Sequence, residues 1–296
     1  MTSHFVVLLL AFASSGALVG ALAVPVLADI SLKRAYARSL AWWYESLQKF
    51  RSFRCAHPDA YPTPRASGSE GALGVWFEDA KSQATRKVLT HERADALRSV
   101  GVVIGADAST RSEQEQAQRC TFRARVWQRA VLAVGCAAWF VSPLFAGMPL
   151  HLAVVLAFCG VAMAVSVVCD LRARMIPLEC CAALLAAGAT FQFLVAGFSG
   201  LLMGCAVAAA VFAVCWVANS VSRAVGGSVG QGDVRCMAAL SVLCGPASLV
   251  GAAACYIAAA LFSAAGLVTH RLDRKSGIPM APFLALWLVF GTVVVR

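Results

Sequence analysis

Two aspartates carry the candidate chemistry of this 296-residue sequence. Asp170 closes one long apolar run, and Asp233 opens another. A carboxylate at membrane depth is costly, so it is a functional candidate by default. Two carboxyl groups a few ångströms apart cannot both ionise cheaply, and they share one proton. The ionised group can then deprotonate a water while the protonated group polarises a carbonyl, which is peptide hydrolysis without a metal or a covalent intermediate.

The spacing of the two aspartates alone leaves other interpretations open. Asp170 lies beside Arg172 and Arg174, and Asp233 lies beside Arg235, so each could form an interfacial ion pair. A proton or cation relay in a small transporter would need similar residues.

The composition indicates which elements must position these residues. Hydrophobic residues make up 60% of the chain and charged residues 14%, whereas soluble domains carry about 25% charged residues. The apolar residues form runs of about 20, long enough to cross a bilayer as helices. The fold class expected is therefore all-α, a polytopic membrane protein. The net charge of +10 is attributed to the basic loops of such a protein, and no nucleic-acid partner is expected.

About eight transmembrane helices are expected, with a large cytoplasmic loop after the first. The predicted parts are a first transmembrane helix at 1–28, a cytoplasmic polar loop or small domain at 29–128, and a seven-helix membrane domain at 129–296. The last part contains a six-helix core at 150–296. The first apolar run could also be a signal peptide. We favour a retained helix, because it has no basic segment before it and Lys33 and Arg34 follow it.

Basic residues occur in alternate predicted loops, which predicts the topology. These residues are Arg172 and Arg174, then Arg223 and Arg235, then Arg271, Arg274 and Lys275. Such loops face the cytoplasm, so the N-terminus and the C-terminus are both expected outside. The predicted loops between the basic ones, Gly147–Pro149, Gly197–Ser199 and Gly245–Ala247, have no charge and are expected outside. The same rule places Asp170 and Asp233 near the cytoplasmic face.

Within the polar segment, Leu40, Trp43, Leu47 and Phe50 repeat at helical spacing. This pattern predicts an amphipathic helix, which we interpret as lying in the membrane interface.

A second helix is expected at the end of the polar segment. Thr110 and Glu113 have the spacing of a capping box. The helix that they open is expected to continue through Arg125 and Arg129 into the second membrane span.

Glycines and a proline flank the two aspartates. Asp233 ends the sequence Gly230-Gln231-Gly232-Asp233, and Gly226-Gly227 precedes it. Glycines allow unusual backbone angles and a close approach of substrate. Ile176-Pro177 follows Asp170, and Pro177 fits the first position of a helix.

These elements resemble the two signatures of the type IV prepilin peptidases, membrane aspartyl peptidases of the GxGD type. The second signature here is Gly-x-Gly-Asp-x-Arg-x-x-Ala-Ala-Leu, from Gly230 to Leu240. The stretch from Ile278 to Ala285 is similar to the Pro-x-x-Pro-Phe-Leu stretch of the family, with Pro279 and Pro282 as its prolines. The resemblance covers about residues 150–296.

The resemblance implies that Asp170 and Asp233 are the catalytic pair of a prepilin leader peptidase. The residues that would bind substrate or shape the site are Gly230, Gly232, Pro177, Arg235, Pro279 and Pro282. The implied partners are the lipid bilayer and prepilin or pseudopilin substrates with an N-terminal apolar helix. The basic leader of these substrates would be cut at the cytoplasmic face of the bacterial inner membrane. No cofactor and no metal site are expected.

The first half of the sequence departs from the family pattern. Many members carry two Cys-x-x-Cys pairs in the first loop, whereas this loop has only Cys55 and Cys120. The sequence therefore gives little support to the family's second activity, N-methylation from S-adenosylmethionine. Two alternatives to a peptidase are a proton- or cation-coupled transporter that uses the aspartates, and an inactive assembly factor that binds pilin helices.

Overall fold

The computed structural model describes residues 3–294, except 59, 65, 86, 106–108, 225–229 and 270–277. Gly226-Gly227, the basic residues Arg271, Arg274 and Lys275, and the C-terminal residue used in the topology prediction lie outside the described residues. The chain forms two compact units, which we call unit 1 (residues 1–32 and 122–296) and unit 2 (residues 33–121).

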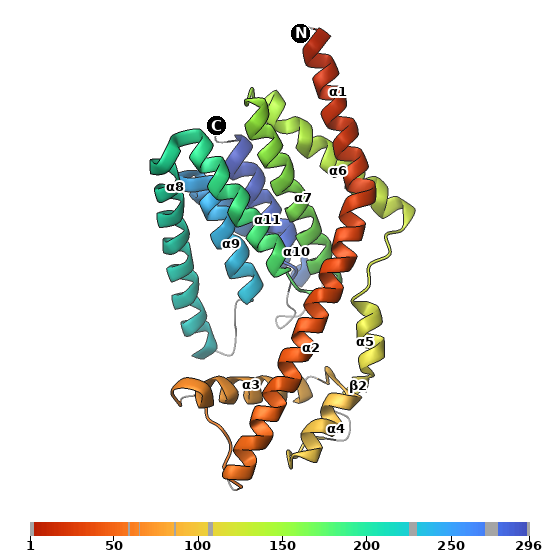
Figure 1. The fold of residues 1–296 in the computed structure, drawn as a ribbon, viewed down its shortest axis with the longest axis vertical. Helices are drawn as coiled ribbons and strands as arrows, with labels where there is room; N and C mark the ends of the chain where they lie inside the picture. The colour runs from red at the N-terminus through yellow and green to blue at the C-terminus, as the bar shows by residue number, and fades with distance from the viewer. Residues whose placement is uncertain are drawn as a thin grey trace. The chain divides into compact units, whose positions relative to one another are not determined.

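The described elements are almost all helical (Figure 1), which confirms the all-α prediction. In chain order they are α1 Ser3–Leu18, η1 Val19–Ala23, α2 Val24–Ala56, α3 Gly68–Thr85, β1 Leu89–Thr90, α4 His91–Ser99, β2 Ser109–Arg111, α5 Glu113–Arg119, α6 Val126–Phe145, α7 Leu150–Ala173, α8 Leu178–Ala224, α9 Gln231–Cys244, η2 Gly245–Ala247, α10 Ser248–Val268, α11 Ala281–Val289 and η3 Phe290–Val294.

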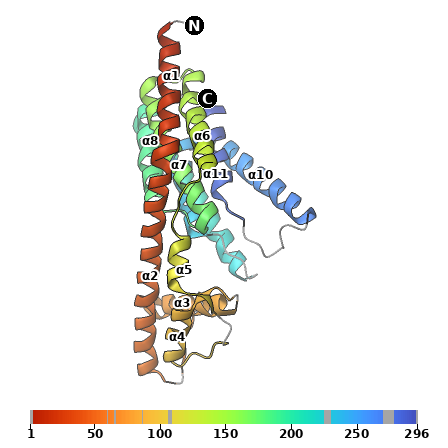
Figure 2. The same ribbon diagram turned by 90° about the vertical axis from the view of Figure 1, so that its right-hand side faces the viewer.

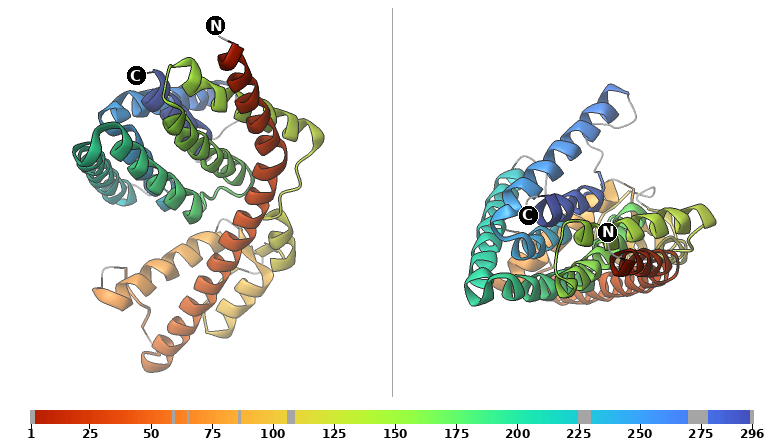
Figure 3. Two further views of the ribbon diagram at one scale, coloured as in Figure 1. Left: turned by 45° about the horizontal axis from the view of Figure 1, so that its top comes forward. Right: turned by 90° about the horizontal axis from the view of Figure 1, so that it is seen from above.

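The core of unit 1 lies among α7, α8, α9 and α11. Helix α9 packs along α8, and α7 contacts both α8 and α11 (Figure 1). Fully buried side chains at their centre include Leu156, Leu184, Phe191, Leu240 and Trp287. Helix α10 diverges from these helices toward its C-terminal end (Figure 3). Helix α1 lies along α6 (Figure 2).

Among the described residues, five helices are long and apolar enough to cross a membrane. They are His4–Ala56, Val126–Phe145, Leu150–Ala173, Leu178–Ala218 and Gln231–Val268, and a shorter apolar helix spans Ala281–Thr292. The predicted count of eight is not confirmed.

Two of these five helices are interrupted, which explains much of the difference in number. Helix α8 breaks at Gly197, whose φ of 65° and ψ of −150° belong to a region that only glycine adopts readily. The second long helix is interrupted by the 3₁₀ turn η2 between α9 and α10. Both interruptions fall where the sequence predicted uncharged loops.

Unit 2 has its own apolar core, which corrects the interpretation of the amphipathic helix. The segment is helical, but Trp43 is only 2% exposed and Phe50 is fully buried. They pack against Trp76 and Phe77 of α3 (ring centroids 5.7 Å apart for Trp43–Trp76 and 4.7 Å for Phe50–Phe77). The prediction that this face lies in the membrane interface is wrong, because α3 supplies the apolar surface that we had assigned to lipid.

The prediction that Thr110 opens a helix is also wrong. Residues 109–111 form strand β2, which pairs in parallel with β1 and is therefore extended. Ser112 caps α5, and its Oγ accepts the N–H of Glu115 over 3.2 Å. Helix α5 ends at Arg119 and α6 begins at Val126, so no continuous helix enters the second span.

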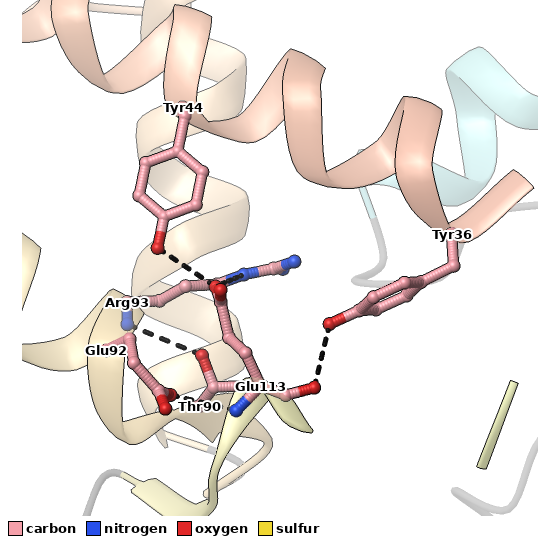
Figure 4. A network of polar contacts seen from close by, with 6 residues as sticks. All are labelled: Tyr36, Tyr44, Thr90, Glu92, Arg93 and Glu113. Carbon is pink, nitrogen blue, oxygen red and sulfur yellow. Dashed lines mark hydrogen bonds and ion pairs between the residues drawn. The ribbon is translucent and has the colours of Figure 1, made fainter. Parts of the chain in front are cut away.

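Glu113 connects the elements of unit 2 (Figure 4). Its Oε1 accepts hydrogen bonds from the Tyr44 hydroxyl at 3.0 Å and from Nε of the buried Arg93 at 3.3 Å. Its backbone carbonyl accepts the Tyr36 hydroxyl at 3.1 Å. Its backbone N–H donates to Oε2 of Glu92 at 2.9 Å. One residue of α5 thus holds α2 and α4 together.

Candidate active site

Asp170 lies in the last turn of α7 and is 5% exposed. Its Oδ2 accepts a hydrogen bond of 2.8 Å from the backbone N–H of Ala281, the first residue of α11. The N-terminal amides of a helix carry partial positive charge, which stabilises an anion placed against them. The Ala281 amide therefore offsets part of the cost of burying a carboxylate at this position.

Arg174 ends α7 in a left-handed conformation (φ 55°, ψ 40°), and its N–H donates to the carbonyl of Asp170 over 2.8 Å. The charge of Arg174 also acts on the Asp170 carboxyl group. Arg172, the other arginine beside Asp170 in the sequence, is exposed. The charge of Arg174 thus acts on Asp170 in the same sense as the Ala281 amide.

Pro177 is buried directly before the first residue of α8, not at the first helical position that we predicted. Its carbonyl accepts the N–H groups of Cys180 and Cys181, at 3.2 Å and 3.3 Å. The proline thus serves as the capping residue, where its missing N–H is of no consequence.

Asp233 is the third residue of α9 and is half-buried. A Cβ atom at Gly230, the capping residue of this helix, would lie 2.8 Å from Oδ2 of Asp233. The carboxyl group thus bends back over the start of its own helix, and glycine is needed there to leave it room. The charges of Asp170 and Asp233 interact with each other.

The two sequence motifs are in direct contact at Gly232. A Cβ atom on Gly232 would lie 3.3 Å from Cβ of Ile176, which is tighter than most such contacts. The Sγ atom of Cys181 lies 4.0 Å from the carbonyl oxygen of Gly232, within the distance of a weak hydrogen bond. The loop between α7 and α8 is therefore packed on the start of α9, which fixes the elements that carry the two aspartates.

The proline motif, Ile278–Ala285, surrounds the backbone N–H of Ala281 that donates to Asp170. Pro279 precedes α11, and Pro282 is its second residue. Sequence reasoning identified these prolines but missed Ala281, which acts through its backbone. The position of Ala281 between two prolines at a helix start was the signal that could have found it. Arg235 is exposed, and no ion pair within the described part of the chain involves it.

Metal ligands do not gather anywhere in the part of the chain that the structure describes: no group of three or more His, Cys, Asp or Glu side chains could hold an ion. Cys55 is exposed and Cys120 is buried, both in unit 2.

One family model matches the part of the chain that contains all of these motifs. Residues 156–294 match the model of the type IV leader peptidase family. This part of the chain is therefore similar to the type IV leader peptidases. No curated protein and no solved structure matches the chain. The leader-peptidase region contains Asp170, Asp233 and the proline motif of α11, so the resemblance drawn from these motifs is confirmed. The family is one of peptidases, and the apolar helices indicate a membrane protein.

Proposed function

We propose that this protein is an intramembrane aspartyl endopeptidase that removes the basic leader of prepilin- or pseudopilin-like proteins. The observation that carries the proposal is the hydrogen bond from Ala281 to Asp170. This hydrogen bond joins the motif of Asp170 and Ile176-Pro177 to the proline motif of α11. The contact of Gly232 with Ile176 joins the same motif to the glycine motif around Asp233. Three segments far apart in the sequence thus meet at Asp170 and at the start of the helix that carries Asp233.

The surroundings of the two carboxyl groups support different roles for them. Burial disfavours the ionised form of Asp170, whereas its hydrogen bond from a backbone N–H and the charge of Arg174 act against that effect. No described residue donates a hydrogen bond to Asp233. Asp170 is therefore the general base of the proposal, and Asp233 carries the shared proton.

The proposed reaction needs only these two groups and a water. The Asp170 carboxylate takes a proton from the water as its oxygen attacks the scissile carbonyl carbon, and the Asp233 carboxyl group protonates the carbonyl oxygen. A tetrahedral diol forms. When it collapses, the C–N bond breaks, the proton held by Asp170 passes to the departing amine, and a proton from the diol returns to Asp233. Both carboxyl groups then have their starting protonation states.

The proposed substrate and membrane face follow from charge. Arg172, Arg174 and Arg235 accompany the two aspartates, and basic loops face the cytoplasm. A prepilin has a short basic leader before an apolar helix, so its scissile bond would lie at the same membrane face. The site is therefore proposed at the cytoplasmic side of the bacterial inner membrane, with both chain termini outside.

The test is co-expression with candidate prepilins encoded near this protein. Wild type, Asp170→Asn and Asp233→Asn would be compared by intact mass of the substrate. We expect leader removal by wild type alone, and an added 14 Da on the product would reveal methylation. If the folded, inserted wild type cuts none of these partners, the proposal fails. Ion flux that depends on the same two aspartates would then favour the transporter.

A further inference from the structure

A groove of about 360 Å³ lies between α6 and α7 in unit 1, and neither Asp170 nor Asp233 lines it. The two helices are neighbours (Figure 1), and Nε1 of Trp139 on α6 donates to the carbonyl of Leu156 on α7 over 2.7 Å. They are joined by a short loop and run antiparallel. The start of α6 therefore lies beside the end of α7, and this is where the groove opens.

The groove is polar at one end and apolar one turn deeper. Trp127 and Gln128 of α6 line it beside Arg172 of α7. Val131 of α6 and Val167 of α7 line the next turn, about 5.4 Å along the helices. A phospholipid has the same order of parts, with a charged headgroup above an acyl chain.

The side chains at the polar end can donate hydrogen bonds but offer little to accept them. Oε1 of Gln128 already accepts the N–H of Arg125 over 2.9 Å, which leaves its Nε2 to donate. Arg172 is exposed, and it forms no ion pair with any residue that the structure describes. The indole of Trp127 is 60% exposed and adds a third N–H.

Acidic side chains near the groove are already engaged. Oδ1 of Asp29 accepts the N–H of Phe122, which lines the groove, over 2.8 Å. Asp170 points to α11, where it accepts the N–H of Ala281. No other acidic residue occurs between Glu115 and Glu179 in the sequence. The ligand that fits these donors is an anion.

We propose that this groove binds an anionic phospholipid, with the phosphate at Arg172 and Gln128 and an acyl chain between Val131 and Val167. Basic pockets between transmembrane helices are suited to such headgroups. Apolar walls exclude water as the stable occupant. A basic peptide is disfavoured because Arg172 would repel it. The proposal is independent of the peptidase activity.

The experiment uses the full-length protein in lipid nanodiscs that contain brominated phosphatidylglycerol or brominated phosphatidylcholine. Bromine quenches tryptophan fluorescence at short range, and the difference between wild type and Trp127→Phe isolates the signal of Trp127. We expect stronger quenching of Trp127 by the anionic lipid. Arg172→Gln should reduce this preference about fivefold, the effect of one arginine near an anionic surface.

Two further variants separate the groove from general surface charge. Arg172→Lys keeps the charge and should keep most of the preference. Arg129→Gln removes an arginine from the same end of α6 that does not line the groove, and it should change little. The proposal is overturned if both lipids quench Trp127 equally in wild type. It is also overturned if Arg129→Gln weakens the preference as much as Arg172→Gln.

Discussion

The backbone N–H of Ala281 donates a 2.8 Å hydrogen bond to Oδ2 of Asp170, 111 positions away in the chain. The donor belongs to the first residue of α11, so the positive end of a helix is directed at a buried carboxylate. This contact gives the proline motif of the leader-peptidase region a physical role: it places an amide that holds the proposed base.

Ala281→Pro removes this donor and should slow leader cleavage. Hydrogen bonds to charged groups contribute about 1.5–3 kcal/mol, so a loss of roughly ten- to hundredfold in cleavage rate is expected. Proline is common at the first position of a helix, but Met280 has helical backbone angles (φ −89°, ψ −25°) that a following proline disfavours, so folding must be checked separately. The rate would be measured on a purified prepilin in detergent, with circular dichroism and thermal unfolding as checks on folding. Ala281→Gly keeps the N–H, so an equal loss in that variant would contradict the role of the hydrogen bond.

Gly230→Ala should displace the carboxyl group of Asp233 without unfolding the protein. The new Cβ would lie 2.8 Å from Oδ2 of Asp233, so the side chain must turn away. Displacement of a reacting group by about 1 Å can reduce a rate about hundredfold. The matched control is Gly135→Ala on α6, where nothing lies within 4 Å of the new atom. Equal cleavage rates in the two variants would show that the position of Asp233 is unimportant.

Gly232→Ala should have a smaller effect than Gly230→Ala. Its Cβ would lie 3.3 Å from Cβ of Ile176, a contact that a shift of a few tenths of an ångström relieves. The loop between α7 and α8 would move with Ile176. We expect a partial loss of cleavage and a modest fall in the unfolding temperature, measured side by side with Gly230→Ala. The reverse order of cleavage rates would contradict the described packing.

Glu113→Ala should destabilise unit 2. The change leaves the buried Arg93 without its ion-pair partner and removes the acceptor of the Tyr44 hydroxyl. We expect a loss of about 2–3 kcal/mol, seen as faster proteolysis within residues 33–121 as the temperature rises. Glu78→Ala is the control, because its pair with Lys81 is exposed and such pairs contribute little. Equal proteolysis of the two variants would show that Glu113 does not connect the unit.

Glu92 should make the stability of unit 2 depend on acidic pH. The backbone N–H groups of Glu92 and Glu113 hold the pKa of the Glu92 carboxyl below its usual value of 4.5. A carboxyl group with a lowered pKa in the folded state stabilises that state fully above the unfolded pKa. This stabilisation is lost as the pH falls through the pKa that the carboxyl group has in the folded state. Glu92→Gln should therefore flatten the fall in unfolding temperature below pH 4.5, measured against wild type. Parallel curves for the two proteins would contradict the prediction.

The sequence by itself determined the helical class, the leader-peptidase motifs and the candidate pair of carboxyl groups. Asp170 and Asp233 were found from residue type, flanking glycines and the edges of apolar runs, because these signals are local. The helical class follows from the length of those runs. The interruptions at Gly197 and after Cys244 also fall at predicted loops, since glycine, proline and a gap in hydropathy act on the nearest few residues.

Only the tertiary structure decided what each surface packs against. The apolar face of Trp43 and Phe50 is covered by α3, although its pattern would suit lipid equally well. Thr110 does not cap a helix, because it belongs to strand β2, which pairs with β1 from another part of the chain. The contact between Ala281 and Asp170 involves a backbone amide, whose position no side chain reveals. Such contacts depend on how distant helices pack, and a periodic pattern specifies which face is buried but not its partner.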